Sequence, residues 1–509
     1  MATKSAYTYQ SSVLTSRLWL VLVLSTLSLL ASTEDYQQLM KSEDVVERAC
    51  IKLQQFFPGQ VFFPDDTLYK HAQSRYWSTQ QGELQPPCRL LPKNAQDVHT
   101  AVLSLGAQNI SFAFASGGHS SVTSASNIAD GVAIDLSSLS DIELVDDNNA
   151  AWLGVGAHWA DVYAALEPSG LVVSGGRVAD VGVGGYVLGG GFSWFANQYG
   201  WTCDSAIEFE VITPDAQHLH VNVDDHKDLF WALKGSLGAF GVVIRIKVPT
   251  IRNRAVYGGA ISYSQEHMPV LFDALVGLSK RAKDDLHTQG YVSFGWSEKV
   301  RAMGTSAYLV NTRSGEPSAA FHTFQQIPHI GSSLREMSLR ESAEEIGKSN
   351  LYGFRRSKFT LTTNCDAHTM QLMHRLCRQA NDATQFGEED MMGVTFQPLT
   401  VPHLQAQSNI FNAPAEGSPL LLVSVEVWWS DASQDHYFEQ RTQDLHSVLT
   451  AALRRANALR AFVYPNYAAR WQNPFEGIGV ERTQKLVAIK QRYDAKDIWR
   501  RLVPGIWHV

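Results

Sequence analysis

Two glycine-rich stretches constrain the fold of this chain more than any other feature of its sequence. The first, Ser116-Gly117-Gly118-His119-Ser120, follows residues 110–115, an apolar run that alternates as a strand does. The second comprises Gly175-Gly176 and residues 182–191. Glycine lets the backbone approach a bulky group closely, and main-chain N–H groups bind phosphate. The two stretches therefore predict a binding site for a large cofactor that carries phosphate.

Common nucleotide-binding motifs do not fit these glycines. A dinucleotide fingerprint, G-x-G-x-x-G, that started at Gly182 would need a third glycine where Val187 stands. If it started at Gly154, the third glycine would fall on Trp159. The P-loop pattern G-x-x-x-x-G-K-[ST] is absent, and residues 118–122 lack the closing glycine of a hydrolase elbow. The sequence therefore predicts neither a nicotinamide Rossmann site nor a P-loop.

His218 and His220 fall on one face of an expected strand, where side chains two residues apart point the same way. Such a pair is a possible metal site, but an exposed hairpin is the simpler interpretation. The sequence contains no H-E-x-x-H and no cysteine spacing typical of zinc. We therefore expect no resident metal.

The composition allows two domains and argues against a nucleic-acid partner. The chain has 509 residues, of which 45% are hydrophobic and 18% are charged, enough for two cores. Its formal net charge is −8 at pH 7. Proteins that bind nucleic acid usually present a basic surface, which this balance does not favour.

The N-terminus has the pattern of a secretory signal peptide over residues 1–31. Lys4 and Arg17 precede an apolar run at residues 18–31 that ends in small residues. This run is short for a membrane span, so an N-terminal anchor helix is the weaker alternative. We expect a secreted protein with no stable membrane span, from which residues 1–31 are removed.

Secretion changes the interpretation of the cysteines. Cys50 and Cys88 flank the first ordered segment and are candidates for a disulfide in an oxidising compartment. The sequence does not decide whether Cys365 pairs with Cys377, which would leave Cys203 free. Asn109-Ile110-Ser111 is an N-glycosylation sequon, so Asn109 is a candidate glycosylation site.

Strand and helix patterns alternate up to residue 250. We expect strands at residues 110–115, 132–136, 151–155 and 240–248, helices at 95–107, 159–166 and 228–234, and a hairpin formed by 207–213 and 218–223. The pattern predicts an α+β or α/β domain with mixed sheets.

Residues 251–455 have longer strands between amphipathic helices. We expect strands at residues 257–263, 290–296, 302–310 and 420–428, with helices at 268–280 and 436–455. Apolar and polar residues alternate clearly at residues 423–427. We therefore expect one face of these strands to be buried and the other to face solvent or line a pocket. This pattern predicts an antiparallel sheet backed by helices, and the aromatic, turn-rich residues 456–509 are expected to return to the first domain.

The Ser-Gly-Gly-His-Ser stretch at residues 116–120 resembles the flavin-attachment motif of vanillyl-alcohol-oxidase-type (PCMH-type) flavoproteins. It is most similar to their berberine-bridge-enzyme-like branch, the FAD-linked oxidoreductases common in fungi. Further stretches that resemble this family are residues 76–78, 175–185, 188–193, 199–204, 228–235, 240–243, 464–467 and 493–494. The resemblance implies an α+β fold in which residues 32–250 form a two-subdomain FAD-binding domain, with its PCMH-type core at 84–250, and residues 251–455 form the substrate-binding domain.

The resemblance also implies that His119 carries FAD through a covalent bond to the flavin 8α-methyl carbon. Some relatives add a second link from a cysteine, but Val178 occupies that position here, so one covalent bond is expected. Val181 matches a position that controls access of oxygen to the flavin in relatives. The residues expected to bind the cofactor are Ser116, Gly117, Gly118, His119, Ser120, Val181, Gly182, Gly184, Gly185, Gly189, Gly190, Gly191, Tyr199, Asp204, Gly241, Val243 and Asn466.

By the same resemblance, Tyr464 and Tyr467 are the candidates for a catalytic base that takes a proton while a hydride passes to the flavin. Tyrosine is a poor base unless nearby cations or hydrogen bonds lower its pKa. The alternative is that one tyrosine only packs and the other faces the substrate. Glu426 and Trp428 are further candidates for the pocket if they lie on the cavity face of their strand.

The expected function is that of a secreted FAD-linked oxidase that acts on a small organic molecule, such as a secondary metabolite, with molecular oxygen as the electron acceptor. A dehydrogenase that reacts poorly with oxygen and a carbohydrate oxidase are alternatives. A non-catalytic flavin-binding or small-molecule-binding protein is another, because Gly238-Ala239 and Ala469 depart from residues common in the family.

Overall fold

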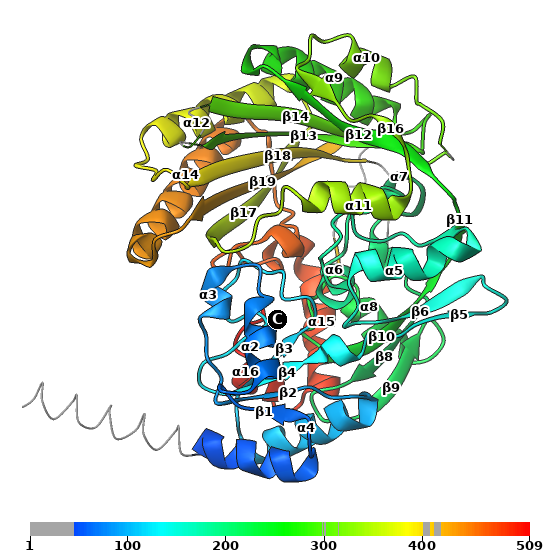
Figure 1. Ribbon diagram of the computed structural model, residues 1–509, viewed down its shortest axis with the longest axis vertical. Helices are drawn as coiled ribbons and strands as arrows, with labels where there is room; N and C mark the ends of the chain where they lie inside the picture. The colour runs from blue at the N-terminus through cyan, green and yellow to red at the C-terminus, as the bar shows by residue number, and fades with distance from the viewer. Residues whose placement is uncertain (1–44, 298, 300–301, 314, 401–407, 412–418) are drawn as a thin grey trace, which may run out of the picture.

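The computed structural model forms two lobes, one below and one above in Figure 1. It describes residues 45–297, 299, 302–313, 315–400, 408–411 and 419–509. The signal peptide expected at residues 1–31 lies outside these residues. No helix in the described part of the chain is both long enough and apolar enough to span a membrane.

The first lobe contains a small mixed sheet in the order β1-β2-β4-β3. Its strands are β1 (Val61–Phe62), β2 (Cys88–Leu90), β3 (Phe112–Ala115) and β4 (Val132–Asp135). Strands β2 and β3 both run parallel to β4, whereas β1 is antiparallel to β2. Helix α4 (Ala95–Gln108) connects β2 to β3, and the Asn94 side chain caps it by accepting a hydrogen bond from the Asp97 N–H.

A second, antiparallel sheet completes the first lobe, in the order β5-β6-β10-β8-β9. Its strands are β5 (Ile142–Val145), β6 (Ala150–Gly154), β8 (Glu208–Ile212), β9 (His218–Asn222) and β10 (Val242–Pro249). The expected hairpin is the antiparallel pair β8–β9. The helices of this lobe are residues 45–56, α2 (Thr67–Ser74), α3 (Thr79–Gly82), α5 (Trp159–Leu166), α6 (Val183–Leu188), α7 (Ala196–Tyr199) and α8 (Lys227–Leu233), and the short strands β7 (Leu171–Val172) and β11 (Ile251–Arg252) pair beside them.

The second lobe is one large antiparallel sheet with helices on the face that points away from the first lobe (Figure 1). Its long strands are β12 (Val256–Tyr263), β13 (Thr288–Ser297), β14 (Ala302–Asn311), β17 (Arg355–Asn364), β18 (Met391–Leu399) and β19 (Leu420–Trp429). The short edge strands are β15 (Gly331–Ser332), β16 (Arg335–Met337) and β20 (Leu459–Arg460), and the covering helices are α9 (Met268–Arg281), α10 (Phe321–Gln325), α12 (Ala367–Asp382) and α14 (Asp435–Arg455). Helix α11 (Leu339–Gly347) lies between the lobes, beside α5. The predicted α+β class, with an antiparallel sheet backed by helices, is confirmed.

The C-terminal residues pack against the first lobe through α15 (Val480–Tyr493) and α16 (Ile498–Leu502). The ring centroid of Trp499, a buried residue, lies 5.7 Å from those of both Phe112 and Phe114. Its Nε1 donates a hydrogen bond to the carbonyl of Gly238 (2.9 Å). The last segment of the chain therefore closes the core around β3.

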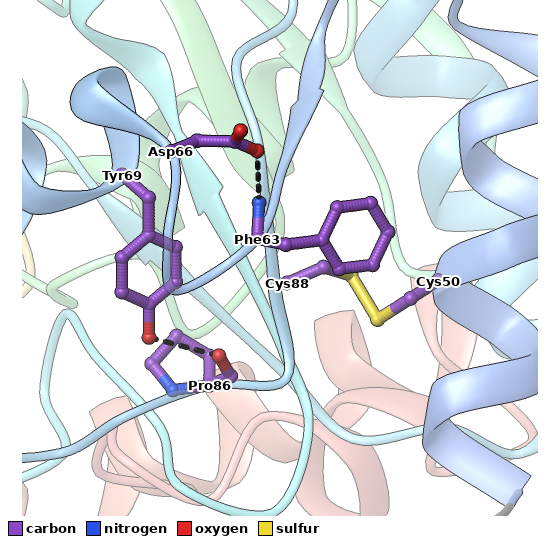
Figure 2. The surroundings of a disulfide bond; sticks show 6 residues. All are labelled: Cys50, Phe63, Asp66, Tyr69, Pro86 and Cys88. Carbon is purple, nitrogen blue, oxygen red and sulfur yellow. Dashed lines mark hydrogen bonds between the residues drawn. A yellow bond between two sulfur atoms is a disulfide. The ribbon is translucent and has the colours of Figure 1, made fainter.

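The predicted disulfide between Cys50 and Cys88 is present and joins the helix over residues 45–56 to the start of β2 (Figure 2). Nearby, the Tyr69 hydroxyl donates to the carbonyl of Pro86 (2.9 Å), which holds the segment that leads into β2. Cys203, Cys365 and Cys377 are free thiols, so the pairing of Cys365 with Cys377 that the sequence left open does not occur.

Candidate functional site

A cavity of about 380 Å³ lies where the two lobes and the C-terminal segment meet. The first lobe contributes both glycine-rich stretches, the second contributes side chains from β17 and β19, and the C-terminal segment contributes Tyr464 and Tyr467. The predicted cofactor residues that line this cavity are Ser116, Gly117, Gly118, His119, Ser120, Val181, Gly182, Gly184, Gly185, Gly241, Val243 and Asn466.

Five other predicted cofactor residues are absent from the lining: Gly189, Gly190, Gly191, Tyr199 and Asp204. A Cβ added at Gly189 would lie 2.0 Å from Oδ1 of Asn466, so this glycine allows the C-terminal segment to approach. Asp204 accepts hydrogen bonds from the side chains of Ser408 and Asn409 and from the N–H of Trp201. These contacts give Gly189 and Asp204 structural roles behind the cavity wall.

The two glycine-rich stretches touch backbone to backbone. A Cβ at Gly117 would lie 2.4 Å from the nitrogen of Gly182, and a Cβ at Gly182 would lie 2.3 Å from the nitrogen of Gly117. Any side chain at either position would force the stretches apart. Gly185 differs, because a Cβ there would meet nothing within 4 Å and would project into the cavity. Its bare backbone therefore leaves room for a ligand.

His119 is held on the cavity wall by residues from both lobes. Its Nε2 lies 2.5 Å from the amide Nδ2 of Asn350, a residue between α11 and β17. Its ring stacks on Trp77, with centroids 4.2 Å apart and planes 15° from parallel. Burial lowers the pKa of His119 to about 4, against the smaller opposing effect of Asp180, and Lys358 lowers it further. The imidazole is therefore neutral at physiological pH and keeps a nitrogen lone pair.

A buried arginine supports the same wall. The guanidinium carbon of Arg356, a fully buried residue, lies 3.8 Å from the ring centroid of Trp77 and 4.7 Å from that of Trp428. Arg356 Nη1 donates to Glu426 Oε1 at 2.9 Å. Glu426 lines the cavity, whereas Trp428 lies behind it against Arg356. The ion pair gives the half-buried carboxylate of Glu426 a partner and fixes it at the cavity surface.

The two candidate tyrosines have different surroundings. Tyr464 is 1% exposed, and burial raises the pKa of its hydroxyl well above the ordinary value. Its ring meets that of Tyr467 edge to face, with centroids 4.8 Å apart. Tyr467 lies under the ammonium of Lys358, 4.2 Å from its ring centroid, and its hydroxyl accepts a hydrogen bond from Arg177 at 3.4 Å. Of the two candidates, Tyr467 therefore has two cations directly beside it.

Arg177 is held at the cavity by aromatic rings. Its guanidinium carbon lies 4.9 Å from the ring centroid of Phe192, 5.0 Å from that of Trp194 and 5.3 Å from that of Tyr291. It also donates to Gln397 Oε1 at 2.5 Å. These contacts orient the hydrogen bond from Arg177 to the hydroxyl of Tyr467.

Sequence reasoning did not identify Asn350, Lys358 or Arg177 as site residues. Arg177 stands within the second glycine-rich stretch, so its place in the chain was a usable signal. Asn350 and His119 are 231 residues apart, and no local pattern marks either Asn350 or Lys358. Only the packing of the second lobe against the first brings them to the cavity.

Comparison with known proteins identifies the family. A sequence family described as an FAD binding domain matches residues 86–222. An FAD-dependent monooxygenase of Cochliobolus heterostrophus is 31% identical over 451 residues, which cover 85% of this chain and 86% of that protein. The chain belongs to the PCMH-type FAD-linked oxidoreductases. Another member, an FAD-dependent monooxygenase of Aspergillus calidoustus, is 30% identical over 477 residues, covering 91% of this chain and 90% of that protein.

Solved structures of PCMH-type FAD-linked oxidoreductases share the fold. The 6-hydroxy-D-nicotine oxidase of Arthrobacter nicotinovorans has a TM-score of 0.71 at 20% identity, covering 88% of this chain and 97% of that one. A chitooligosaccharide oxidase has a TM-score of 0.70 at 16% identity, covering 91% of this chain and 100% of that one. The predicted resemblance to berberine-bridge-enzyme-like flavoproteins is confirmed, and this chain is an FAD-dependent oxidoreductase.

The residues around the cavity suit FAD. Gly185 leaves the open space that a Cβ would fill, and Gly117 and Gly182 hold the two backbone stretches together beside it. The buried Nε1 of Trp77, on the cavity wall, has no hydrogen-bond partner within the described part of the chain. A bound group that carries acceptor oxygens or nitrogens would satisfy this donor.

Proposed function

We propose that FAD occupies this cavity and is attached to the chain by one covalent bond, through His119. The observation that carries the proposal is the state of His119: it is neutral, half-buried on the cavity wall and fixed by Trp77 and Asn350. A neutral imidazole has the lone pair that such a bond requires. Val178 cannot supply the second link that a cysteine provides in some relatives.

In the proposed reaction, the flavin supplies the acceptor for a hydride from the substrate. In its phenolate form, which Lys358 and Arg177 stabilise, Tyr467 takes the proton that the substrate loses and becomes a neutral phenol. Asn466 donates hydrogen bonds to the hydroxyl of Tyr464 (3.1 Å) and to the carbonyl of Tyr186 (2.9 Å). Tyr464 therefore shapes the wall and positions Tyr467 through their edge-to-face contact.

The proposed substrate is a small organic molecule, such as a secondary metabolite or its precursor, and the proposed electron acceptor is molecular oxygen. The fungal relatives support this class, and the single-link site favours it over a carbohydrate. Because those relatives are FAD-dependent monooxygenases, oxygen insertion is a second candidate outcome. Turnover under ¹⁸O₂ separates the two, because an oxidase releases labelled H₂O₂ whereas a monooxygenase places the label in the organic product.

Secretion and glycosylation are also proposals. The disulfide between Cys50 and Cys88 is typical of proteins from oxidising compartments and supports secretion. Asn109 is exposed, as a glycosylated residue must be, and its side-chain oxygen accepts a hydrogen bond from Arg501 (2.5 Å). A mass shift on treatment of the secreted protein with a glycosidase that removes N-linked glycans tests both at once.

Acid denaturation of the purified protein tests the flavin proposal. We expect flavin colour to stay with the chain, and one peptide that contains His119 to carry the added mass. His119→Ala should release all flavin into the supernatant, whereas His436→Ala, an exposed histidine on α14, should retain it. Release of all flavin from the unaltered protein would contradict the covalent proposal. A bound flavin that is not reduced by light under anaerobic conditions would favour the non-catalytic alternative.

A further inference from the structure

The β8–β9 hairpin presents two histidines and two glutamates on one face of its sheet. Glu208 and Glu210 lie on β8, and His218 and His220 lie on β9. The register pairs Glu210 with His220 directly across the two strands. Because side chains two residues apart in a strand point to the same face, all four share that face. Strand β9 is the edge strand of the sheet (Figure 1). Both histidines are exposed.

Three of these side chains converge closely enough to share one ion. One ligand atom each from Glu210, His218 and His220 lie within 4.8 Å of one another. Nε2 of His218 is 2.7 Å from Oε1 of Glu210. A zinc ion lies about 2.0–2.2 Å from nitrogen and oxygen ligands, so small side-chain rotations suffice to bring the three atoms around it.

Neighbouring hydrogen bonds orient two of the proposed ligand side chains, His220 and Glu210. Nδ1 of His220 is 2.7 Å from Oε1 of Glu208. When Nδ1 donates its proton to this carboxylate, Nε2 carries the lone pair, which is the usual arrangement of a histidine that binds a metal. Arg245 Nε donates to Oε2 of Glu210, which holds that carboxylate in place with its Oε1 facing Nε2 of His218.

The charge of this face also favours a cation. The guanidinium of Arg245 contacts two carboxylates, that of Glu210 and that of Glu143, which lies 4.0 Å from its Nη1. Glu208 adds a third carboxylate, opposite Lys247 across strands β8 and β10. Lys247, the other cation on this face, is paired with Asp146 at 2.8 Å. Four carboxylates, those of Glu143, Asp146, Glu208 and Glu210, thus lie beside two cations, and a divalent ion would compensate the difference.

We propose that this face binds one divalent transition-metal ion, with Zn²⁺ as the representative ion, through His218, His220 and Glu210. Glu208 is a positioning residue that orients His220. Two imidazoles and one carboxylate form a ligand set suited to zinc, and water completes the coordination. No residue of the hairpin lines the cofactor cavity. The ion therefore cross-links the edge strand β9 to strand β8 and takes no part in the redox reaction.

The sequence alone favoured a hairpin without a metal. His218 and His220 were visible there as a pair, but two imidazoles without a third ligand make a weak site. The register that places Glu210 opposite His220, and the hydrogen bond that orients His220, appear only in the folded chain.

Zinc binding to the flavin-loaded protein tests the proposal. After treatment with a chelator and its removal, Zn²⁺ is titrated in competition with a chromophoric chelator. We expect one Zn²⁺ per chain. His218→Ala and His220→Ala should each weaken binding by at least about tenfold, and Glu208→Ala should weaken it by about 10–100-fold. His368→Ala, an exposed histidine on α12, should bind as the unaltered protein does.

The proposal would be overturned by the absence of stoichiometric Zn²⁺ in the unaltered protein, or by unchanged affinity in the double variant His218→Ala/His220→Ala. A Ca²⁺ affinity equal to that of Zn²⁺ would also contradict it, because imidazole ligands favour zinc over calcium. Thermal unfolding gives a second readout. Zn²⁺ should raise the midpoint of the unaltered protein and leave that of the double variant unchanged. Equal far-UV circular dichroism and equal flavin content would show that the double variant is folded.

Discussion

At the scale of single residues, Tyr464 and Tyr467 differ in their surroundings, and this difference suits them to different roles. Tyr464 is closed off by burial, and its hydroxyl receives a hydrogen bond from Asn466. Tyr467 lies next to two cations, Lys358 and Arg177. The same side-chain chemistry therefore gives a structural phenol in one position and a candidate base in the other.

Tyr467→Phe is expected to slow reduction of the flavin by substrate about 10²–10⁴-fold, the usual contribution of a general base. Tyr464→Phe should slow it less than about tenfold. Anaerobic stopped-flow absorbance at the flavin band measures both rates, with covalent flavin content as the control for cofactor loading. Lys358→Met should also slow flavin reduction, because it removes the ammonium that lies beside the ring of Tyr467. A larger loss in Tyr464→Phe would assign the base to that residue.

Asn350 is the residue through which the second lobe reaches His119. Its Nδ2 lies 2.5 Å from His119 Nε2 and 3.4 Å from Asp180 Oδ1. Asn350→Leu removes the hydrogen bond that orients the imidazole. Because such a bond contributes about 1 kcal/mol, covalent attachment of flavin should become about fivefold slower.

The ratio of acid-precipitated to total flavin, followed over time after expression, measures the effect of Asn350→Leu. Ser349→Ala is the matched control, since its hydroxyl donates to the backbone carbonyl of Ile346 and stands beside Asn350 in the chain. Equal attachment in Asn350→Leu and the unaltered protein would show that Trp77 and burial orient His119 without the amide.

The sequence predicted the residues whose role depends on local backbone. Gly117 and Gly182 could be recognised in the sequence, because only glycine allows the close backbone contact that they make. The roles of Lys358 and Asn350 could not be predicted from the sequence. A single lysine or asparagine does not indicate a particular role, and the partners of these two residues lie in the other lobe. The direct role of each predicted residue toward FAD stays a prediction.

At the scale of elements, the disulfide fixes the first helix to the sheet. Cys50 and Cys88 close a loop of 38 residues. In the chain-entropy model, closing a loop of this length stabilises the folded state by about 4 kcal/mol. Cys50→Ala/Cys88→Ala should therefore lower the unfolding free energy of the first lobe by about 2–4 kcal/mol.

Denaturant unfolding with and without a thiol reductant measures this loss. The reductant should bring the unaltered protein to the level of the double variant and have no effect on the variant itself. Cys365→Ser, which replaces the thiol by a hydroxyl and so keeps a hydrogen-bond donor near Ser279, should change the midpoint little. Equal stability of the double variant and the oxidised protein would contradict a stabilising role for this bond.

Elements with clear alternation were predicted well, and elements with a polar buried face were missed. The helix at residues 159–166 and the strand at 257–263 match α5 and β12 closely. Strands β17 and β18 were not expected. In β17, Thr360, Thr362 and Thr363 are fully buried, so the sequence of the strand looks polar although its environment does not. Two of these hydroxyls have partners within the fold, because Thr360 donates to the carbonyl of Val423 and Thr363 donates to the carbonyl of Asn364.

At the scale of the whole molecule, the C-terminal segment joins the lobes. Trp499 packs in the first lobe, and Tyr464 and Tyr467 line the cavity. Gln472 then reaches the edge of β17 in the second lobe. Its Oε1 accepts from the N–H of Thr360 (3.1 Å), and its Nε2 donates to the carbonyl of Thr360 (2.8 Å). Strand β20 pairs with β17 at Thr362 and Thr363, so the amide of Gln472 continues this edge where the short strand ends.

Replacing Gln472 by leucine should therefore weaken the junction between the lobes. Thr360 is fully buried, and its N–H and carbonyl would both lose their partner, which costs about 1–3 kcal/mol for each group. We expect a loss of about 2–4 kcal/mol in unfolding free energy and faster hydrogen exchange at the amide of Thr360. Gln443→Leu, which changes an exposed glutamine on α14, is the control and should leave both quantities unchanged.

Because Lys358 lies two residues from Thr360 on β17, Gln472→Leu should also loosen the position of Lys358 over Tyr467 and slow flavin reduction. If exchange at Thr360 stayed slow while flavin reduction fell, Gln472 would act on the cavity by a route other than the edge of β17.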